Sequence, residues 1–265
     1  MIIDGRALAR DILAETKLRA EALVRRPKVV ALVGSETPAT KSYLKIKSAR
    51  AADAGCDFEV RPYPSPYEDA SAVIVQLPLA EGVDANAACD ALPLEKDADV
   101  LSAAARERFE KGEGGALLPP VVGAVKKVLE VGGVEVVGKR AVVVGRGFLV
   151  GAPVATWLKQ QGAEVSVVTK ETADLFEALS AADIIVSGAG VPNLITPDVL
   201  KQEVVLIDAA TSESNGIIAG DADPACSEKC ALFTPVPGGI GPIAVACLFE
   251  NAVTLAERQT GGFSF

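Results

Sequence analysis

The 265-residue sequence predicts an α/β protein built on parallel sheets. Short apolar runs at 28–33, 72–75 and 141–144 have the composition of strands that are buried on both faces. Longer helical stretches separate most of these runs, as in strand–helix–strand units. The chain is long enough for one large domain or for two modest ones, and either would have an ample core.

The composition argues against several classes of protein. A formal net charge of −9 argues against nucleic acid as a partner. Charged residues such as Asp4 and Arg6 interrupt the start of the chain, so we expect no signal peptide, and we expect no apolar run to approach a membrane span. The protein is therefore expected to be cytoplasmic. Because the sequence has no histidine, acid–base chemistry near neutral pH has to use Lys, Tyr, Cys or a carboxylate with a shifted pKa.

The five cysteines are scattered and show no paired CxxC spacing. We expect reduced thiols rather than disulfides or a zinc site, and no bound metal. Two of the five could lie one helical turn apart, at 226 and 230, but two ligands do not make a metal site. The set is Cys56, Cys89, Cys226, Cys230 and Cys247.

The first helix is expected to begin after Asp4, whose side chain can cap it, and to end near Pro27. A buried strand follows over 28–33. A turn over 34–40 then leads into a second helix, which should run up to Gly55.

The second helix begins with a basic run. Residues 41–50 hold four cations and no acid, in a chain that is acidic overall. A solvated basic face is the usual explanation of such a run. The alternative is a local site for an anionic substrate, and Tyr43 and Lys47, one turn apart on one face, keep that alternative open.

The link between the next two strands is too short for a helix of normal length. We expect these strands over 57–61 and 72–75, and parallel neighbours usually need a crossover of about a dozen residues or more. The crossover over 62–71 should therefore contain no full helix, which leaves one face of the sheet thinly covered. Gln76 follows the second strand, at the carboxyl end where α/β sites form.

The second half of the chain follows a boundary at 112–120 that is rich in glycine and proline. Near its end, the loop at 234–242 is a stiff turn or, alternatively, a stretch whose exposed backbone lines a ligand closely. We expect helices at 84–91, 121–131 and 243–258 and strands at 141–144, 164–168, 182–187 and 204–208.

A glycine turn at 145–151 is the most informative stretch. An apolar strand leads directly into Gly145 and Gly147, and Gly151 stands six residues after Gly145, with GxGxxxG spacing rather than GxGxxG. Gly145 lets the chain reverse, Gly147 lets the backbone approach a pyrophosphate, and the amides of the following helix offer an anion site. The strands that follow favour a Rossmann-like dinucleotide-binding domain over an ordinary strand-to-helix turn.

The end of the second strand of that domain bears on which dinucleotide binds. An NAD-binding unit usually has Asp or Glu there for the ribose hydroxyls, but here the strand ends in Val168, Thr169 and Lys170. Arg146 and Lys170 could instead meet the 2′-phosphate of NADP. We therefore favour NADP over NAD, which stays possible because both cations could be solvated surface residues.

Six motifs occur in order along almost the whole chain. They are IDGRALA at 3–9, YLKIK at 43–47, VQLPL at 75–79, KDAD at 96–99, GRGFLVGAP at 145–153 and TPVPGGIGP at 234–242. Together they resemble the bifunctional methylenetetrahydrofolate dehydrogenase/cyclohydrolase family. After a similar start, that family has the motifs YxxxK, VQLPL, KDVD, GRSxxVGxP and TPVPGGVGP.

The resemblance implies two α/β domains around a cleft. A shortened folate-binding catalytic domain would comprise 1–119 and 243–265, with the final helix returning to it, and a Rossmann-like domain would comprise 120–242. A homodimer is also implied. The two reactions would be oxidation of 5,10-methylenetetrahydrofolate to the 5,10-methenyl form with a nicotinamide cofactor, and hydrolysis of that form to 10-formyltetrahydrofolate.

The resemblance also assigns roles by position. Lys47 would be the catalytic lysine, Gln76 its partner, Tyr43 a ring stacked on the folate and Asp99 the anchor of the pterin. The expected substrate-binding residues are Tyr43, Gln76, Pro78, Asp99, Pro237, Gly238 and Gly239. The expected cofactor-binding residues are Gly145, Arg146, Gly147, Val150, Gly151, Lys170, Ala210 and Thr211.

Several positions depart from the family's pattern. Val100 follows Asp99 where the family has glycine, Gly147 replaces a serine, and Thr169 and Lys170 stand where a histidine and a serine are expected. These changes cluster around the cofactor and pterin contacts. Two alternatives therefore stay open: a family member with only one of the two activities, and a nucleotide-binding relative without catalysis.

Overall fold

The computed structural model describes residues 1–35, 37–171, 175–214 and 217–261. The chain forms two compact units. Met1–Leu8 and Val121–Ala244 make up the five-stranded unit, and Ala9–Pro120 with the chain from Val245 on makes up the three-stranded unit. The main sheet of each unit is parallel, so the predicted α/β fold class is confirmed.

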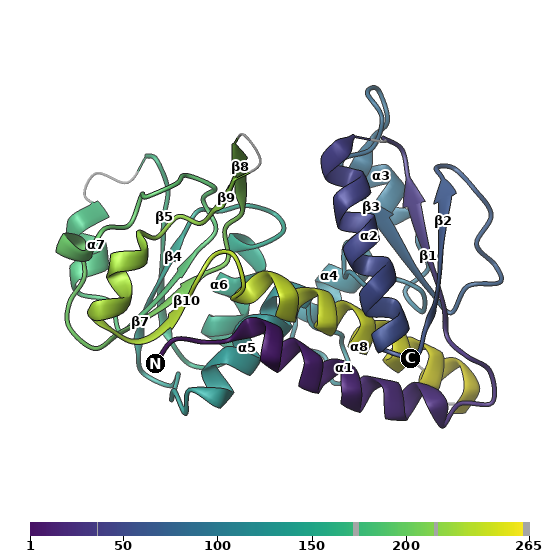
Figure 1. The fold of residues 1–265 in the computed structure, drawn as a ribbon, viewed down its shortest axis with the longest axis horizontal. Helices are drawn as coiled ribbons and strands as arrows, with labels where there is room; N and C mark the ends of the chain where they lie inside the picture. Colours follow the sequence, from purple (N-terminus) through teal and green to yellow (C-terminus); the bar gives the residue numbers. More distant parts are fainter. Residues whose placement is uncertain (36, 172–174, 215–216, 262–265) are drawn as a thin grey trace. The chain divides into compact units, whose positions relative to one another are not determined.

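The sheet of the five-stranded unit has the strand order β10-β7-β6-β4-β5 (Figure 1). Its order reverses between β4 and β6, because β5 lies on one side of β4 and all later strands lie on the other. In open parallel sheets such a reversal leaves a crevice at the carboxyl ends of the two strands, where ligands bind. The strands are β4 (Arg140–Val144), β5 (Glu164–Val168), β6 (Ile184–Ser187), β7 (Val204–Asp208) and β10 (Cys230–Thr234).

β10 was not predicted from the sequence. Residues at the chain start pair with it: Ile3 donates its backbone N–H to Phe233 O at 2.9 Å, and Phe233 N–H donates to Met1 O at 2.9 Å. A short antiparallel hairpin, β8 (Ser212–Ser214) with β9 (Ile217–Ala219), also lies where only a polar loop was expected. The helices of this unit are α5 (Pro120–Val131), α6 (Gly151–Gln160), α7 (Leu175–Ser180) and the 3₁₀ helices η1 (Pro197–Val199) and η2 (Pro224–Glu228).

The three-stranded unit has the parallel strand order β2-β1-β3. Its strands, β1 (Lys28–Val33), β2 (Asp57–Pro62) and β3 (Ala72–Gln76), lie within one residue of their predicted bounds. Val30, Leu32, Val73 and Val75 point into one core on the same face of the sheet. The helices that contribute to this unit are α1 (Gly5–Glu21), α2 (Pro38–Asp53), α3 (Ala85–Asp90), α4 (Ala103–Glu110) and α8 (Ile240–Gly261).

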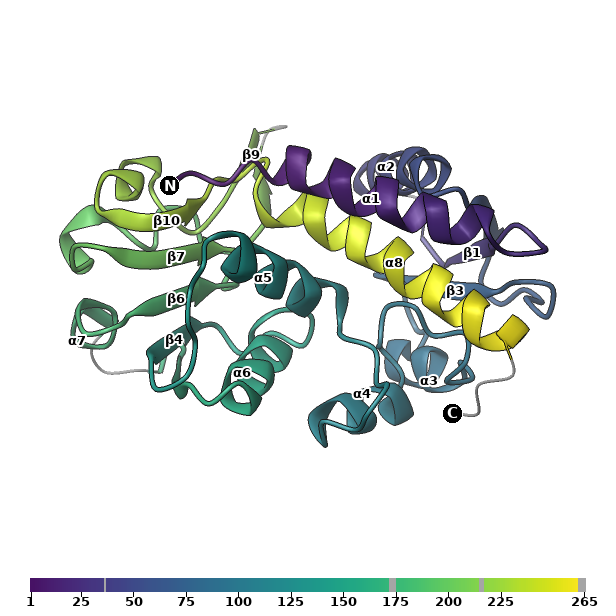
Figure 2. The same cartoon turned by 90° about the horizontal axis from the view of Figure 1, so that it is seen from below.

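The later parts of α1 and α8 lie side by side in this unit (Figure 2). Arg19 donates to both carboxylate oxygens of Glu257, at 2.9 and 2.6 Å, and to Thr254 Oγ1 at 2.7 Å. These contacts hold the last turns of α8 against α1.

The link between β2 and β3 contains no helix, as predicted. The side chains of Tyr63 and Tyr67 pack instead against the core on that face of the sheet. The ammonium group of Lys96 donates to three carbonyls of the link, Tyr67 O at 3.2 Å and Glu68 O and Ala70 O at 2.8 Å each. Two aromatic rings and one half-buried lysine therefore take the place of a crossover helix.

Several helix ends differ from the prediction. α1 ends at Glu21 rather than near Pro27. α2 begins at Pro38, because Thr37 caps it by accepting a hydrogen bond from Thr40 N at 3.1 Å. α8 begins at residue 240, three residues earlier than expected, and α4, α7, η1 and η2 were not predicted.

α8 corrects the expectation that no apolar run approaches a membrane span. It is the one helix of the described residues that is long and apolar enough, by length and composition, to cross a membrane. Within that stretch 61% is buried inside the protein, and Phe249, Ala252, Val253 and Leu255 are fully buried core residues. Its apolar composition is accounted for by this core packing.

Candidate active site

The side chain of Lys47 lies at the carboxyl end of β3. It comes from α2, which also carries Tyr43 one turn earlier on the same side. Lys47 Nζ donates a hydrogen bond to Gln76 Oε1 at 3.0 Å, and Gln76 Nε2 donates to Leu77 O at 2.8 Å. Because both ends of the Gln76 amide are engaged, the carboxamide is fixed with its oxygen towards the lysine.

The segment around Asp99 is held next to β3. Asp97 forms a parallel bridge with Val73, and its buried carboxylate accepts from Leu101 N at 3.2 Å and Ser102 N at 2.8 Å. Burial raises the pKa of Asp99, an effect that Asp97 reinforces and the nearby Lys47 opposes. The structure therefore brings Lys47, Gln76 and Asp99 together.

Tyr43 and Pro78 border this group and are open to solvent. The side chain of Tyr43 is 46% exposed although it is a large aromatic ring. Pro78 is also exposed, two residues after the buried Gln76. An exposed ring beside a fixed lysine side chain is a surface on which a planar ligand can stack.

The glycine turn of the five-stranded unit is closely packed. Gly145 has a φ of +94°, and a Cβ at that position would lie 3.0 Å from Gly188 O, in the loop after β6. A Cβ at Gly151, the first residue of α6, would lie only 2.1 Å from Gly145 O. Gly147 differs, because the nearest atom to an added Cβ is Gly188 O at 3.9 Å. Gly145 and Gly151 are thus required by the turn itself, whereas Gly147 leaves room beside it.

The start of α6 and two cations lie at the same edge of the sheet. Val150 precedes the helix and forms no side-chain cap, so its own side chain satisfies none of the first amides. Val144 and Val168 are partners at the ends of β4 and β5, and Arg146 and Lys170 each stand two residues beyond. Both are exposed, and Lys170 is 3.9 Å from Glu171. Two cations at neighbouring strand ends suit a phosphate group.

Two buried carboxylates order the loops after β6 and β7. Asp208 accepts from Ala210 N at 3.0 Å and Ala222 N at 2.8 Å, which fixes the segment of Ala210 and the exposed Thr211. Burial raises the pKa of Asp208 to about 6. Asp221 accepts from Ser187 Oγ at 2.6 Å and from the backbone N–H groups of Ala189 and Val191 at 2.7 and 2.6 Å.

The loop of Pro237, Gly238 and Gly239 belongs to the five-stranded unit. Gly239 N donates to Pro235 O at 2.8 Å, and Gly238 has a φ of +107°. A Cβ at Gly5 would lie 1.9 Å from Gly239 O, so the loop is in direct backbone contact with the start of α1. Close backbone packing accounts for the glycines of this loop. The ligand contacts expected of Pro237, Gly238 and Gly239 stay a prediction.

Comparison with known proteins identifies the family. The family model described as "Tetrahydrofolate dehydrogenase/cyclohydrolase, NAD(P)-binding domain" matches residues 119–260. The chain is also 34% identical over 280 residues to the Bifunctional protein FolD of Dechloromonas aromatica, covering 98% of each. This chain belongs to the tetrahydrofolate dehydrogenase/cyclohydrolase family.

Solved structures of the family have the same fold. The bifunctional FolD dehydrogenase/cyclohydrolase of Campylobacter jejuni is 30% identical with a TM-score of 0.92, over 98% of this chain and 99% of that one. The FolD of Trypanosoma brucei, solved with NADP cofactor and inhibitor, is 31% identical with a TM-score of 0.90, over 98% of each chain. The family suggested by the sequence motifs is therefore confirmed.

Two features of this family member's site were not found from the sequence. Asn251 of α8 donates from Nδ2 to Ala98 O at 3.0 Å and to Leu118 O at 2.9 Å, which fixes the Asp99 segment from the far end of the chain. Val100 is buried at a φ of +58°, a conformation that β-branched residues rarely adopt. Asn251 gives no local signal in the sequence, because its contacts lie far along the chain. The glycine that the family has in place of Val100 does give a local signal.

Proposed function

We propose that this chain oxidises 5,10-methylenetetrahydrofolate to 5,10-methenyltetrahydrofolate with NADP and hydrolyses the product to 10-formyltetrahydrofolate. The observation that carries the proposal is the hydrogen bond from Lys47 Nζ to Gln76 Oε1 beside Asp99. The relatives that are named bifunctional dehydrogenase/cyclohydrolase support both reactions.

The hydrolytic step is assigned to Lys47. Water adds to the methenyl carbon and one of its protons passes to Lys47 Nζ. The second proton leaves the new hydroxyl group as the carbon–N5 bond breaks and N5 takes up a proton, which leaves the formyl group on N10. With no histidine in the chain, an amine held at a defined point is the candidate proton carrier. Gln76 Oε1 orients that amine by accepting its hydrogen bond.

The folate is assigned to the surface beside these residues. Asp99 would hydrogen-bond to the pterin, and the exposed ring of Tyr43 would stack on the planar part of the substrate. Pro78 would line the same site. Pro237, Gly238 and Gly239 are proposed as further substrate contacts, through their exposed backbone groups.

The five-stranded unit fits a dinucleotide. NADP, when bound, supplies the acceptor for the hydride from the methylene carbon. The room beside Gly147 and the start of α6, which the side chain of Val150 does not cap, suit a pyrophosphate, in a turn that Gly145 and Gly151 keep tight.

The remaining cofactor contacts concern the adenosine ribose and the nicotinamide. Arg146 and Lys170 would hold the 2′-phosphate, and NAD is the alternative if they do not. The T. brucei relative solved with NADP supports this choice. Ala210 and Thr211 are proposed as the remaining cofactor contacts.

We also propose, on the family resemblance, that the protein acts as a cytoplasmic homodimer. Its functional domains would be 1–119 with 243–265 for folate and 120–242 for the cofactor. The net charge of −9 supports the absence of a nucleic-acid partner.

The direct test uses the purified protein with 5,10-methylenetetrahydrofolate and either NADP or NAD. The proposal predicts methenyl absorbance and reduced cofactor with NADP, and hydrolysis of methenyltetrahydrofolate supplied alone. One reaction without the other would identify a monofunctional member. Neither reaction, with cofactor still bound, would identify a nucleotide-binding relative and overturn the proposal.

A further inference from the structure

Asp99 belongs to a short turn whose backbone is held on both sides. Before it, Asn251 Nδ2 donates a hydrogen bond to Ala98 O at 3.0 Å. After it, the buried carboxylate of Asp97 accepts from the backbone N–H groups of residues 101 and 102, at 3.2 and 2.8 Å. The two residues between these fixed points take a conformation that their surroundings impose.

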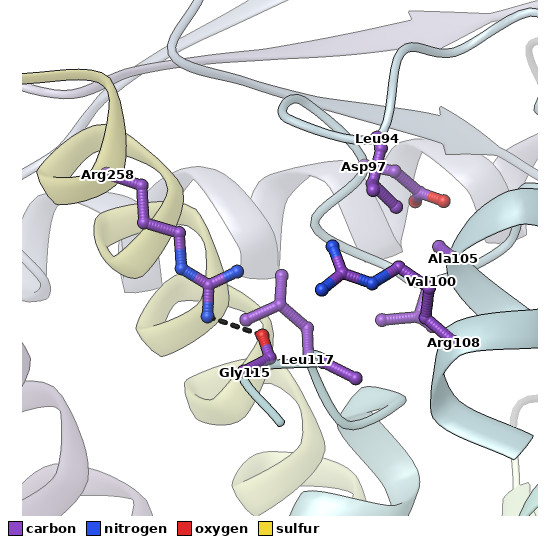
Figure 3. A pocket seen from close by; sticks show the side chains of 9 residues that line it. Leu94, Asp97, Val100, Ala105, Arg108, Gly115, Leu117 and Arg258 are labelled. Atoms are coloured by element: carbon purple, nitrogen blue, oxygen red, sulfur yellow. Dashed lines mark hydrogen bonds between the residues drawn. The ribbon is translucent and has the colours of Figure 1, made fainter. Parts of the chain in front are cut away.

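Val100, the second of these two residues, is strained. Its φ is +58°, in the left-handed region that β-branched residues rarely enter. Its side chain is 2% exposed, and Figure 3 shows it among the side chains that border a small pocket, together with Ala105 and Leu117. Strained residues persist only where the contacts around them over-determine their geometry, and they cluster at functional sites. The turn should therefore relax when one of its supports is removed.

α8 supplies part of this support from the far end of the chain. Arg258 Nη2 donates to Gly115 O at 2.7 Å (Figure 3). Asn251 Nδ2 donates to Leu118 O at 2.9 Å as well as to the carbonyl before Asp99. A side-chain amide nitrogen has two N–H donors, so these two carbonyls use the full donor capacity of Asn251. Asn251 thus ties the turn to a second segment that α8 also holds.

We propose that Asn251 is a positioning residue for the folate substrate. By holding Ala98 O, it keeps Asp99 and the strained Val100 in the one conformation that presents the Asp99 carboxylate to the pterin. The inference rests on the proposed function, because it takes Asp99 as the pterin contact. Asn251 itself acts only through a backbone carbonyl.

The test measures KM and kcat of Asn251→Leu with 5,10-methylenetetrahydrofolate and, separately, with the methenyl form. Leu has nearly the same size as Asn but no N–H donor. KM should rise about tenfold or more, because the turn loses a support and relaxes. The value of kcat should stay close to the parent's, since Asp99 is assigned to binding of the pterin. NADP binding should be unchanged.

The matched control is Gln259→Leu on the same helix. Gln259 Nε2 donates to Ser71 O and Glu95 O at 2.8 Å each, so this change also removes two hydrogen bonds to backbone carbonyls. It leaves the carbonyl before Asp99 in place. A general loss of stability would affect both variants, whereas a loss of positioning should raise the KM of Asn251→Leu alone.

Relief of the strain gives a second readout. Glycine adopts a positive φ without a steric penalty, so Val100→Gly combined with Asn251→Leu should recover most of the lost KM. Val100→Gly alone provides the reference for this comparison. A purely structural loss would not be repaired in this way, because glycine also removes buried side-chain atoms.

Asn251→Ser, with a smaller polar side chain and a single donor, covers the case in which Asn251→Leu does not fold, and its KM should also rise. An unchanged KM in a folded Asn251 variant, an equal rise in Gln259→Leu, or no recovery in the double variant would each overturn the inference. A parent chain that turns over neither folate substrate would overturn the proposed function, and this inference with it, before any variant is compared.

Discussion

Replacing Gly151 by Ala should disrupt the glycine turn. The added Cβ would lie 2.1 Å from Gly145 O, and real Cβ contacts are not found below 3.0 Å, so the start of α6 has to move by about 0.9 Å. The obstacle is a backbone carbonyl, so no side chain can rotate away. Overpacking of this kind costs about 1–3 kcal/mol, and the rigid obstacle places Gly151→Ala near the upper end.

Thermal unfolding of the five-stranded unit measures this effect. With about 2–4 °C per kcal/mol, the midpoint for Gly151→Ala should fall by roughly 5–10 °C. The matched control is Gly147→Ala, four residues earlier in the same turn, where the nearest atom to the new Cβ is 3.9 Å away. Its midpoint should stay within the equivalent of about 1 kcal/mol of the parent. A midpoint for Gly151→Ala equal to the parent's, or an equal loss in Gly147→Ala, would refute the packing described for this turn.

Three further predictions concern other parts of the chain. Lys96→Met removes the cation that binds Tyr67 O, Glu68 O and Ala70 O, so the three-stranded unit should lose about 2–3 kcal/mol in denaturant unfolding. The control Lys111→Met breaks an exposed pair with Glu107 and should leave the unfolding curve unchanged. Because burial raises the pKa of Asp208 to about 6, the folded chain keeps a proton that the unfolded chain releases near pH 4. The free energy of unfolding should therefore fall by up to about 3 kcal/mol as the pH rises from about 4 to 6. Asp208→Asn should flatten that slope in a pH series of unfolding curves. Reversing the charges of Arg146 and Lys170 to Glu should lower the ratio of kcat/KM for NADP over NAD by about tenfold or more, and an unchanged ratio would remove both residues from the 2′-phosphate site.

The fold followed from local patterns wherever each element carried its own signal. Apolar runs located β1, β3, β4 and β7 to within a residue, because strands buried on both faces have a distinctive composition. β10 lacked such a clear run, since Cys230 and Ala231 begin it and its pairing with residues 1–3 depends on the opposite end of the chain. Non-local pairing of this kind leaves no trace in a short window of sequence.

The residues of the candidate site also differ in whether they carry a local signal in the sequence. Lys47 and Gln76 stood out as a helix residue and a strand end, and the structure joins them by a hydrogen bond. Asn251 could not be predicted, because its function depends on α8 lying beside the backbone of Ala98. The departure at Val100 was visible in the sequence, because the family has glycine there, but the positive φ that strains it was not; this strain is expected to cost about 1–3 kcal/mol.

The hydrolytic activity of Lys47→Met tests the central claim most directly. Met keeps much of the side-chain length and removes the amine, and the control Lys45→Met makes the same change at an exposed position two residues earlier on α2. With methenyltetrahydrofolate as substrate, Lys47→Met should lose about 100-fold or more of the parent rate while NADP binding and the unfolding midpoint are retained, and Lys45→Met should hydrolyse at the parent rate. Hydrolysis by Lys47→Met at close to the parent rate would contradict the account.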